Sequence, residues 1–342
     1  MTDLWHYLKT SVKPIYLYGM GNGAEKILDT LDAHGLRASG VFASDGFVRK
    51  KTFRGFELKS FSEVISESPD CIVLVAFGTQ LPNVIANIKR ISTLTELYAP
   101  DVSVFGSDLF DLDYCKKNAS RIERVYSILA DNASKHTFKS LVYYKLTGNV
   151  NYLFDCESSP EQTFLTLVNP TESDIFVDLG AYRGDTVSEF LCYVPKPRSV
   201  FAVEPDPKTF KKLISNVPDF VTCVNAAVTD VDGTVFFDKN VGRGSHLSDS
   251  GVQVPSVSVD GLLKGKPATY IKMDVEGAEK QAIYGARSTI ANFKPRLNIA
   301  AYHRAFDIID IPEQVLSINP DYKVYLRHFP YVPAWDTNYY FV

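Results

Sequence analysis

The stretch Asp174-Ile-Phe-Val-Asp-Leu-Gly-Ala-Tyr-Arg-Gly-Asp185 decides the fold of this chain. Its first half is an apolar run with a single acid, which is typical of a buried parallel strand. Gly180 and Gly184 then predict a turn, and Thr186 with Glu189 has the spacing of a capping box, so a helix is expected to begin at Thr186. Strand, glycine turn and helix in this order are how α/β folds present backbone N–H groups and a helix N-terminus to a ligand.

Two acids at the ends of neighbouring strands narrow the choice of ligand. Asp178 lies near the end of the first strand, and Glu204 follows the next apolar strand, Ser199–Val203. A carboxylate beside the glycine turn would repel a pyrophosphate, whereas an acid ending the second strand of such a unit can hold ribose hydroxyls. The pair predicts a nucleoside ligand with a positive end and no phosphates, which S-adenosylmethionine satisfies. The alternative is a generic strand–helix unit with incidental acids.

Length and composition set broader limits. The 342 residues predict two domains, and 45% hydrophobic with 22% charged residues is ordinary for a soluble globular protein. A net charge of −4 argues against a broad nucleic-acid surface. There is no apolar run of roughly 18 residues, the length that a membrane span needs, and we see no signal peptide. Five cysteines without a Cys-x-x-Cys pair suggest reduced thiols, so we expect a cytoplasmic protein.

Residues 1–107 are predicted to form a small Rossmann-like α/β domain. Gly19, Gly21 and Ala24 match the Gly-x-Gly-x-x-Gly/Ala pattern, and Asp45 follows at the distance of a ribose-binding acid. One interpretation is a dinucleotide or sugar-nucleotide site. The other is a module that uses the glycines only for a tight turn and contacts a partner or a substrate. The shortness of the unit favours the second interpretation.

Residues 108–157 are predicted to be a helical linker, and residues 158–342 the second domain. Apolar residues recur in the linker at spacings of three and four, which predicts two helices whose stripe is core and not a binding face. The positions that carry this pattern are Ile122, Val125, Tyr126, Leu129, Phe138, Leu141 and Val142.

The second domain continues as alternating strands and helices. A third strand is predicted at Val221–Val228, and it brings Asn225 to the carboxyl edge of the sheet, where it could meet an adenine. The polar segment Gly242–His246 between two further strands either closes over the site or forms a solvated hairpin. Residues 322–328 and 337–342 are too close together for a crossover helix, so they should pair as an antiparallel hairpin at the sheet edge.

Four motifs in order carry a family resemblance. They are Val177–Thr186, Val203–Pro207, Ile271–Glu279, and Tyr302-His303 with Asp307 and Ile311-Pro312. Over residues 164–342 the chain resembles the FkbM family of class I S-adenosylmethionine-dependent methyltransferases. The resemblance implies a doubly wound seven-stranded sheet with an antiparallel edge strand. It also implies O-methylation, with natural-product and sugar hydroxyls among the family's substrates.

The resemblance also assigns cofactor contacts by position. The residues expected at S-adenosylmethionine are Asp178, Gly180, Tyr182, Gly184, Glu204, Asn225, Ala226 and Asp274. Those of the glycine turn would cradle the methionine part, Glu204 the ribose, and Asn225 with Ala226 the adenine. Tyr182-Arg183 departs from the family pattern, in which an Asn and an apolar residue are common, so the details of these contacts should differ.

Methylation of a hydroxyl requires removal of its proton, and two residues are candidates for this step. Asp274 and His303 follow adjacent predicted strands, and the ordinary pKa of a histidine, about 6.5, suits proton uptake at neutral pH. His303 is therefore the preferred base. Asp274 and Glu276, two residues apart, could instead hold Mg²⁺ or Mn²⁺ together with His303.

The sequence thus predicts an S-adenosylmethionine-dependent O-methyltransferase that acts on a hydroxyl of a saccharide or of a related small-molecule or glycan acceptor. The alternative is a nucleotide- or sugar-nucleotide-binding protein, or an NAD-dependent oxidoreductase, that works through residues 1–107. No nucleic-acid partner is expected. Homo-oligomer formation and metal dependence are left open.

Overall fold

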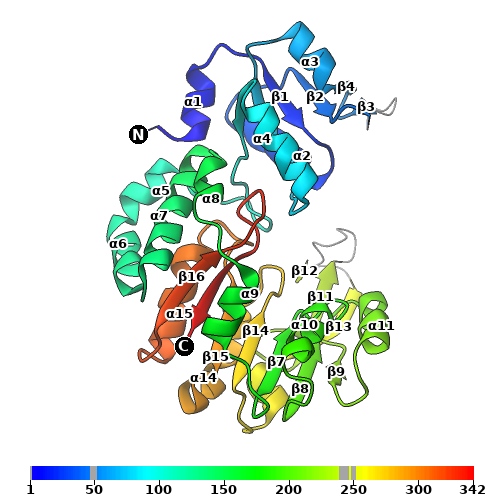
Figure 1. Ribbon diagram of the computed structural model, residues 1–342, viewed down its shortest axis with the longest axis vertical. Helices are drawn as coiled ribbons and strands as arrows, with labels where there is room; N and C mark the ends of the chain where they lie inside the picture. Colours follow the sequence, from blue (N-terminus) through cyan, green and yellow to red (C-terminus); the bar gives the residue numbers. More distant parts are fainter. Residues whose placement is uncertain (1, 47–51, 239–245, 248–251) are drawn as a thin grey trace.

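The computed structural model describes residues 2–46, 52–238, 246–247 and 252–342. Two α/β units lie one above the other in Figure 1, and a group of helices lies beside them. Most of the predicted polar loop Gly242–His246 is outside the described residues, so the choice between a closing loop and a hairpin is untested.

The first unit is a six-stranded sheet in the order β3-β4-β2-β1-β5-β6, with only β3 antiparallel to its neighbour. Its elements are α1 (Leu4–Thr10), β1 (Ile15–Tyr18), α2 (Asn22–Ala33), β2 (Gly40–Ala43), β3 (Thr52–Phe53), β4 (Phe56–Ser60), α3 (Phe61–Glu67), β5 (Ile72–Val75), α4 (Pro82–Ser92) and β6 (Glu96–Tyr98). The sequence analysis missed β4 and α3, although Ser60 and Glu63 form a capping box there.

The helical segment consists of α5 (Leu112–Lys117), α6 (Ala119–Ile128), α7 (Asn132–Thr147) and α8 (Asn151–Phe154). Most of the predicted apolar stripe is confirmed as core, because Val125, Phe138 and Leu141 lie in one buried cluster with strands of the second sheet. Tyr126 is the exception, since its side chain is exposed. Helix α7 also bonds to the edge of that sheet, where the N–H of Leu326 donates to Oγ of Ser134 at 3.0 Å. The segment therefore completes the second unit as well as linking it to the first.

The second unit is built on a seven-stranded sheet in the order β16-β17-β15-β14-β7-β8-β9, in which β17 is antiparallel to both of its neighbours. Its elements are α9 (Pro160–Thr163), η1 (Phe164–Val168), β7 (Ile175–Leu179), α10 (Asp185–Tyr193), β8 (Ser199–Val203), α11 (Pro207–Asn216), β9 (Thr222–Val224), β14 (Tyr270–Met273), α13 (Glu279–Gly285), α14 (Arg287–Phe293), β15 (Arg296–Ala300), α15 (Asp307–Ile318), β16 (Val324–His328) and β17 (Thr337–Phe341). The predicted fold class and the terminal hairpin are confirmed.

The single third strand predicted at Val221–Val228 is wrong. Strand β9 ends at Val224, and β10 (Ala227–Val228) belongs to a separate sheet in the order β10-β13-β11-β12. That sheet contains β11 (Gly233–Asp238), β12 (His246–Leu247) and β13 (Val252–Val257), and α12 (Val259–Leu263) follows it. Between β9 and β10, Nδ2 of Asn225 donates to the carbonyls of Glu204 and Pro205 at 2.8 and 3.1 Å. These bonds hold the chain beside the carboxyl end of β8, at the point where it leaves the main sheet.

One predicted helix start is also wrong. Helix α10 begins at Asp185, and its cap is Gly184 in the left-handed region (φ 86°), without a side-chain capping bond. Thr186 is therefore already inside the helix and cannot form the predicted capping box with Glu189. Helix α15 begins at Asp307 and contains Pro312.

The two units meet at the carboxyl ends of their strands (Figure 1). After β5, Thr79 exchanges backbone hydrogen bonds of 2.8 and 2.9 Å with Val332, which lies between β16 and β17. After β6, the N–H of Phe105 donates to the carbonyl of His303 at 3.0 Å, just beyond β15. The first unit therefore covers part of the edge at which the sequence predicts the site.

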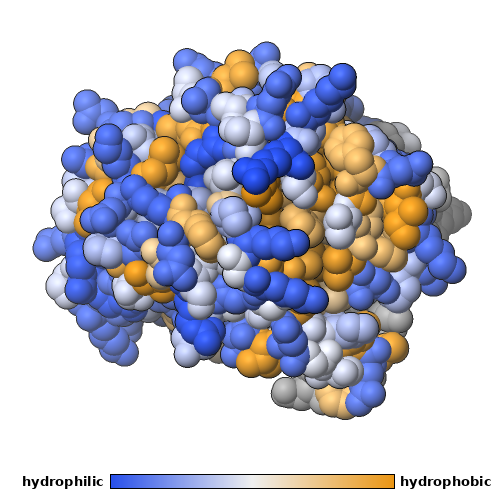
Figure 2. Space-filling view, turned by 90° about the horizontal axis from the view of Figure 1, so that it is seen from below, coloured by the Kyte–Doolittle hydropathy of each residue, from blue (hydrophilic) through white to orange (hydrophobic). Residues whose placement is uncertain are grey.

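Figure 2 shows the molecule of Figure 1 from below. On this face, apolar residues gather in a patch that hydrophilic side chains cross. In the part of the chain that the structure describes, no helix combines the length and the apolar character needed to cross a bilayer.

Candidate active site

The glycine turn after β7 brings two strands into contact. A Cβ on Gly180 would lie 1.9 Å from the carbonyl oxygen of Asp274, and Gly180 has a φ of +82°. Only glycine satisfies both conditions without a shift of the backbone. The turn predicted to hold the cofactor therefore lies directly against the end of β14, which carries the candidate catalytic acid.

Asp178 is completely buried beside this turn, and neither of its carboxylate oxygens has a hydrogen-bond partner. The nearest cation is Lys272, whose Nζ lies 3.9 Å from Oδ1. Burial raises the pKa of Asp178 to about 6. A buried carboxylate without a donor is costly, so the site favours a ligand that brings a positively charged or hydrogen-bonding group to this turn.

Glu204 connects the glycine turn to β8. Its Oε2 accepts a hydrogen bond from the N–H of Tyr182 at 3.0 Å, and its Oε1 accepts one from the N–H of Asp206 at 2.9 Å. Burial raises the pKa of Glu204 to about 7. Each oxygen can accept a further bond, so this carboxylate fits a pair of ribose hydroxyls.

Other predicted cofactor residues already make contacts within the protein. Because Nδ2 of Asn225 already donates to two backbone carbonyls, adenine could meet only its Oδ1. Ala226 is buried next to it. A Cβ on Gly184 would lie 2.6 Å from the side chain of Val217, the residue after α11. Packing against this residue therefore explains the glycine without a ligand. An open hollow of about 680 Å³ lies beside the turn, lined by Tyr182, Arg183, Asp185, Ser188, Ser215 and Asn216.

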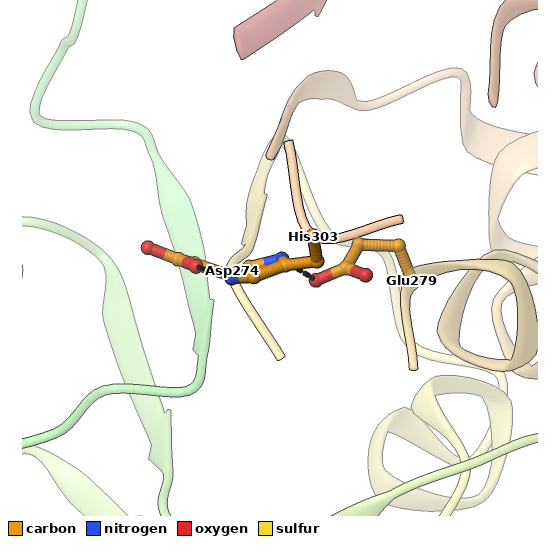
Figure 3. Close-up of side chains that lie close together, drawn as sticks. All are labelled: Asp274, Glu279 and His303. Atoms are coloured by element: carbon orange, nitrogen blue, oxygen red, sulfur yellow. Dashed lines mark ion pairs between the residues drawn. The ribbon is translucent and has the colours of Figure 1, made fainter. Parts of the chain in front are cut away.

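The predicted catalytic residues do come together, around a buried imidazole. His303 is 1% exposed, and its Nε2 lies 3.5 Å from Oδ1 of Asp274 and 3.4 Å from Oε2 of Glu276. Its Nδ1 lies 2.9 Å from Oε1 of Glu279 on the opposite side of the ring (Figure 3). Burial alone would lower the pKa of His303, but the carboxylates of Glu279, Asp274 and Glu276 raise it to about 10. The imidazole is therefore protonated at neutral pH.

Asp274 remains a weak base in the same cluster. Burial would raise its pKa, but Lys272 and His303 together hold it below the ordinary value of an aspartate. The hydroxyl of Tyr302 also donates to Oδ1 of Asp274 at 3.2 Å. This carboxylate is ionised at neutral pH and is held on three sides.

Glu279, which is 1% exposed, also belongs to this cluster and was not predicted from the sequence. Its Oε1 accepts the N–H groups of Val275 and Gly277 at 3.0 and 3.4 Å, and it faces His303. The only signal in the sequence was an acid at the start of a helix, which is an ordinary place for a solvated glutamate. Only the packing of α13 against the residues after β15 shows that Glu279 orients the histidine.

The predicted metal ligands do not fit a single ion. Among the described residues, the three acid or histidine groups whose ligand atoms lie within 4.8 Å of one another are Asp274, Glu279 and His303, a set without Glu276. Asp274 and Glu279 lie on opposite ring nitrogens of His303, and one ion cannot bind both nitrogens (Figure 3). Oε1 of Glu279 is also occupied by two backbone N–H groups.

Residues 178–322 match the family model described as "Methyltransferase FkbM domain". The chain carries an FkbM methyltransferase domain. The match begins at Asp178 in β7 and ends after α15, so it includes Glu204, Asp274 and His303 and excludes the first unit.

Two further comparisons agree with this assignment. The crystal structure of a methyltransferase FkbM from Methylobacillus flagellatus KT aligns with a TM-score of 0.72 at 22% identity, over 97% of this chain and 90% of that chain. The similarity therefore extends to the fold of the first unit. The hexuronic acid methyltransferase AglP of Haloferax volcanii is 26% identical over 137 residues, which are 37% of this chain. The chain spans about half of that relative's length, 55%.

Proposed function

We propose that this protein is an S-adenosylmethionine-dependent O-methyltransferase that acts on a hydroxyl of a saccharide or of a related glycan or small molecule. One observation carries the proposal: the Gly180 turn, with Asp178 and Glu204 beside it, touches the strand end that bears Asp274, next to His303. A cofactor pocket and a proton-handling cluster thus share one edge of the FkbM domain.

The residues of the pocket fit the predicted cofactor. S-adenosylmethionine, when bound, supplies a methyl group on a positively charged sulfur that an aligned oxygen can displace. Asp178 would face the positively charged part of this ligand and Glu204 its ribose, while Asn225 and Ala226 would lie at the adenine. The unpartnered oxygens of Asp178 support this arrangement.

The cluster favours a hydroxyl over a carboxylate as the group that is methylated. A hexuronic acid, after which the AglP methyltransferase is named, offers both hydroxyls and a carboxylate. Asp274 and Glu276 are 33% and 38% exposed at the site, so a second carboxylate there would be repelled, whereas a hydroxyl would not. We therefore favour a saccharide hydroxyl over a carboxylate.

We propose a role for His303 that differs from the one predicted from the sequence. That prediction assumed an ordinary histidine pKa, but a pKa of about 10 leaves no free imidazole to take a proton at neutral pH. A protonated His303 would instead donate from Nε2 toward the acceptor oxygen. Asp274, ionised and held by Tyr302, would fix the orientation of the acceptor.

The proposal is tested by calorimetric titration with S-adenosylhomocysteine. We expect binding by the wild type, and binding weakened by about tenfold to a hundredfold in Glu204→Ala, the loss typical of hydrogen bonds to a charged group. Because the carboxylate must be ionised to accept both hydroxyls, affinity should fall as the pH drops below about 7. Glu57→Ala, an exposed acid of β4, is the matched control and should bind as the wild type does.

Parallel titrations with NAD⁺ and a sugar nucleotide address the alternative function. Binding of either one, without binding of S-adenosylhomocysteine, would show that the first unit carries the activity and that the proposal is wrong.

A further inference from the structure

We propose that Glu276 is the catalytic base that takes the proton of the acceptor hydroxyl, and that Glu279 positions it. This inference rests on the proposed methyl transfer. It assigns the proton to a residue that the sequence analysis considered only as a metal ligand.

The turn that carries Glu276 is held by contacts with Glu279 and Phe105. Glu276 has a φ of +53°, a left-handed conformation that is strained for a residue with a side chain. The carboxylate of Glu279 holds the N–H groups on both sides of it, those of Val275 and Gly277. Gly277, with φ +88°, packs so closely under Phe105 of the first unit that a Cβ there would lie 2.8 Å from the ring. Such strain persists only where the surroundings fix it, and it aims the Glu276 side chain.

Of the three candidates for the base, Glu276 is the most available. His303 is buried and protonated, and Asp274 lies within 3.6 Å of Lys272, His303 and the hydroxyl of Tyr302. Within the described residues, the Glu276 carboxylate pairs with His303, at 3.4 Å. Its side chain is 38% exposed, so it can reach a hydroxyl that binds beside the imidazole.

The charged groups that face Glu276 come from four elements. They are His303 after β15, Asp274 after β14, Glu279 on α13 and Glu204 after β8. Burial, partly offset by the cation of His303 and reinforced by the three acids, raises the pKa of Glu276 to about 7. A carboxylate with such a pKa accepts a proton at neutral pH far better than an ordinary glutamate does.

The step balances in atoms and charge. The hydroxyl oxygen forms a bond to the methyl carbon while the carbon–sulfur bond breaks, and that electron pair stays on sulfur. The O–H proton passes to the Glu276 carboxylate, which becomes a neutral acid and later returns the proton to water. His303 stays protonated throughout and stabilises the negative charge that develops on the oxygen.

The decisive variant is Glu276→Gln, which keeps the shape of the side chain and removes its basicity. Assays use tritiated S-adenosylmethionine and methyl β-D-glucopyranosiduronic acid as the acceptor. We expect kcat to fall about 100- to 10,000-fold, the usual contribution of a general base, while S-adenosylhomocysteine binding and thermal stability stay near those of the wild type. The product should be an alkali-stable ether.

Glu279→Gln tests the positioning role. We expect this substitution to lower the pKa of the His303 ring, which NMR of its Cε1–H can measure. We also expect it to move the acidic limb of the pH profile of kcat/KM. A residue that only packs the helix would change stability without moving either titration.

The outcomes separate this inference from the proposed function. Glu276→Gln with near-normal kcat, an alkali-labile methyl ester, or activity lost to EDTA and restored by Mg²⁺ would each overturn the role of Glu276 and leave the methyltransferase assignment intact. A wild-type protein that binds no S-adenosylhomocysteine would overturn both.

Discussion

Gly180 shows how a single residue links the two halves of the site. Two separate conditions require a glycine here. One is its left-handed φ, and the other is the Asp274 carbonyl, which leaves no room for a Cβ. The sequence predicted the first condition, because a glycine turn follows the strand. It could not show the second, since the contact depends on how β7 and β14 align in the sheet.

Alanine substitutions at two glycines measure the cost of the left-handed φ and the cost of the close contact separately. Gly265 has a similar φ of +78°, but a Cβ there would meet nothing within 4 Å. We expect Gly265→Ala to cost only the backbone strain, about 1–2 kcal/mol, and Gly180→Ala to cost at least about 2 kcal/mol more because the strands must separate. Urea denaturation gives both free energies of unfolding. Equal losses would show that β14 yields easily and that the contact does not hold the turn.

Helix α15 shows a compensation between elements. Pro312 lies inside the helix and cannot donate the backbone hydrogen bond that the carbonyl of Ile308 would otherwise accept. The hydroxyl of Tyr339, on β17, donates to that carbonyl at 2.6 Å instead. The antiparallel strand β17 thus supplies the bond that the helix lacks.

A double-mutant cycle tests this compensation. Tyr339→Phe leaves the buried carbonyl of Ile308 without a donor and should cost about 1–3 kcal/mol. In the Pro312→Ala background a backbone N–H becomes available, so the same substitution should cost about 1 kcal/mol less. The free energies of unfolding in urea measure the cycle. An identical cost in both backgrounds would rule out the exchange of donors.

The whole molecule is held by a buried cluster that extends through both units. It includes Val73 of the first sheet, Phe138 of α7 and Ile271 of the second sheet. Backbone bonds from Thr79 to Val332 and from Phe105 to His303 add to this contact. The first unit therefore packs against one side of the proposed catalytic cluster.

The two tryptophans report on this coupling, since Trp5 lies in α1 and Trp335 in the loop between β16 and β17. Trp335→Phe leaves a probe in the first unit, and Trp5→Phe leaves one in the second. Circular dichroism measures the overall unfolding of each variant in urea. If the cluster makes the chain one cooperative unit, the fluorescence midpoint of each variant should coincide with its circular-dichroism midpoint. Two separate transitions within one variant would show independent domains.

The sequence by itself determined the local elements and the residue types of the site. Strand and helix periodicity, the glycine turns, and the acids at strand ends Asp178, Glu204 and Asp274 depend on neighbours along the chain, and short-range sterics and hydrogen bonds fix them. The match of residues 178–322 to the FkbM domain agrees with that interpretation.

The tertiary structure alone decided which charges meet. Glu279 reaches His303 only because α13 packs beside the end of β15, and Phe105 from the first unit packs against the His303 ring. Those contacts raise the pKa of His303 and make Glu276 the available carboxylate. Burial and charge spacing between distant segments set these properties, and no pattern along the sequence encodes them directly.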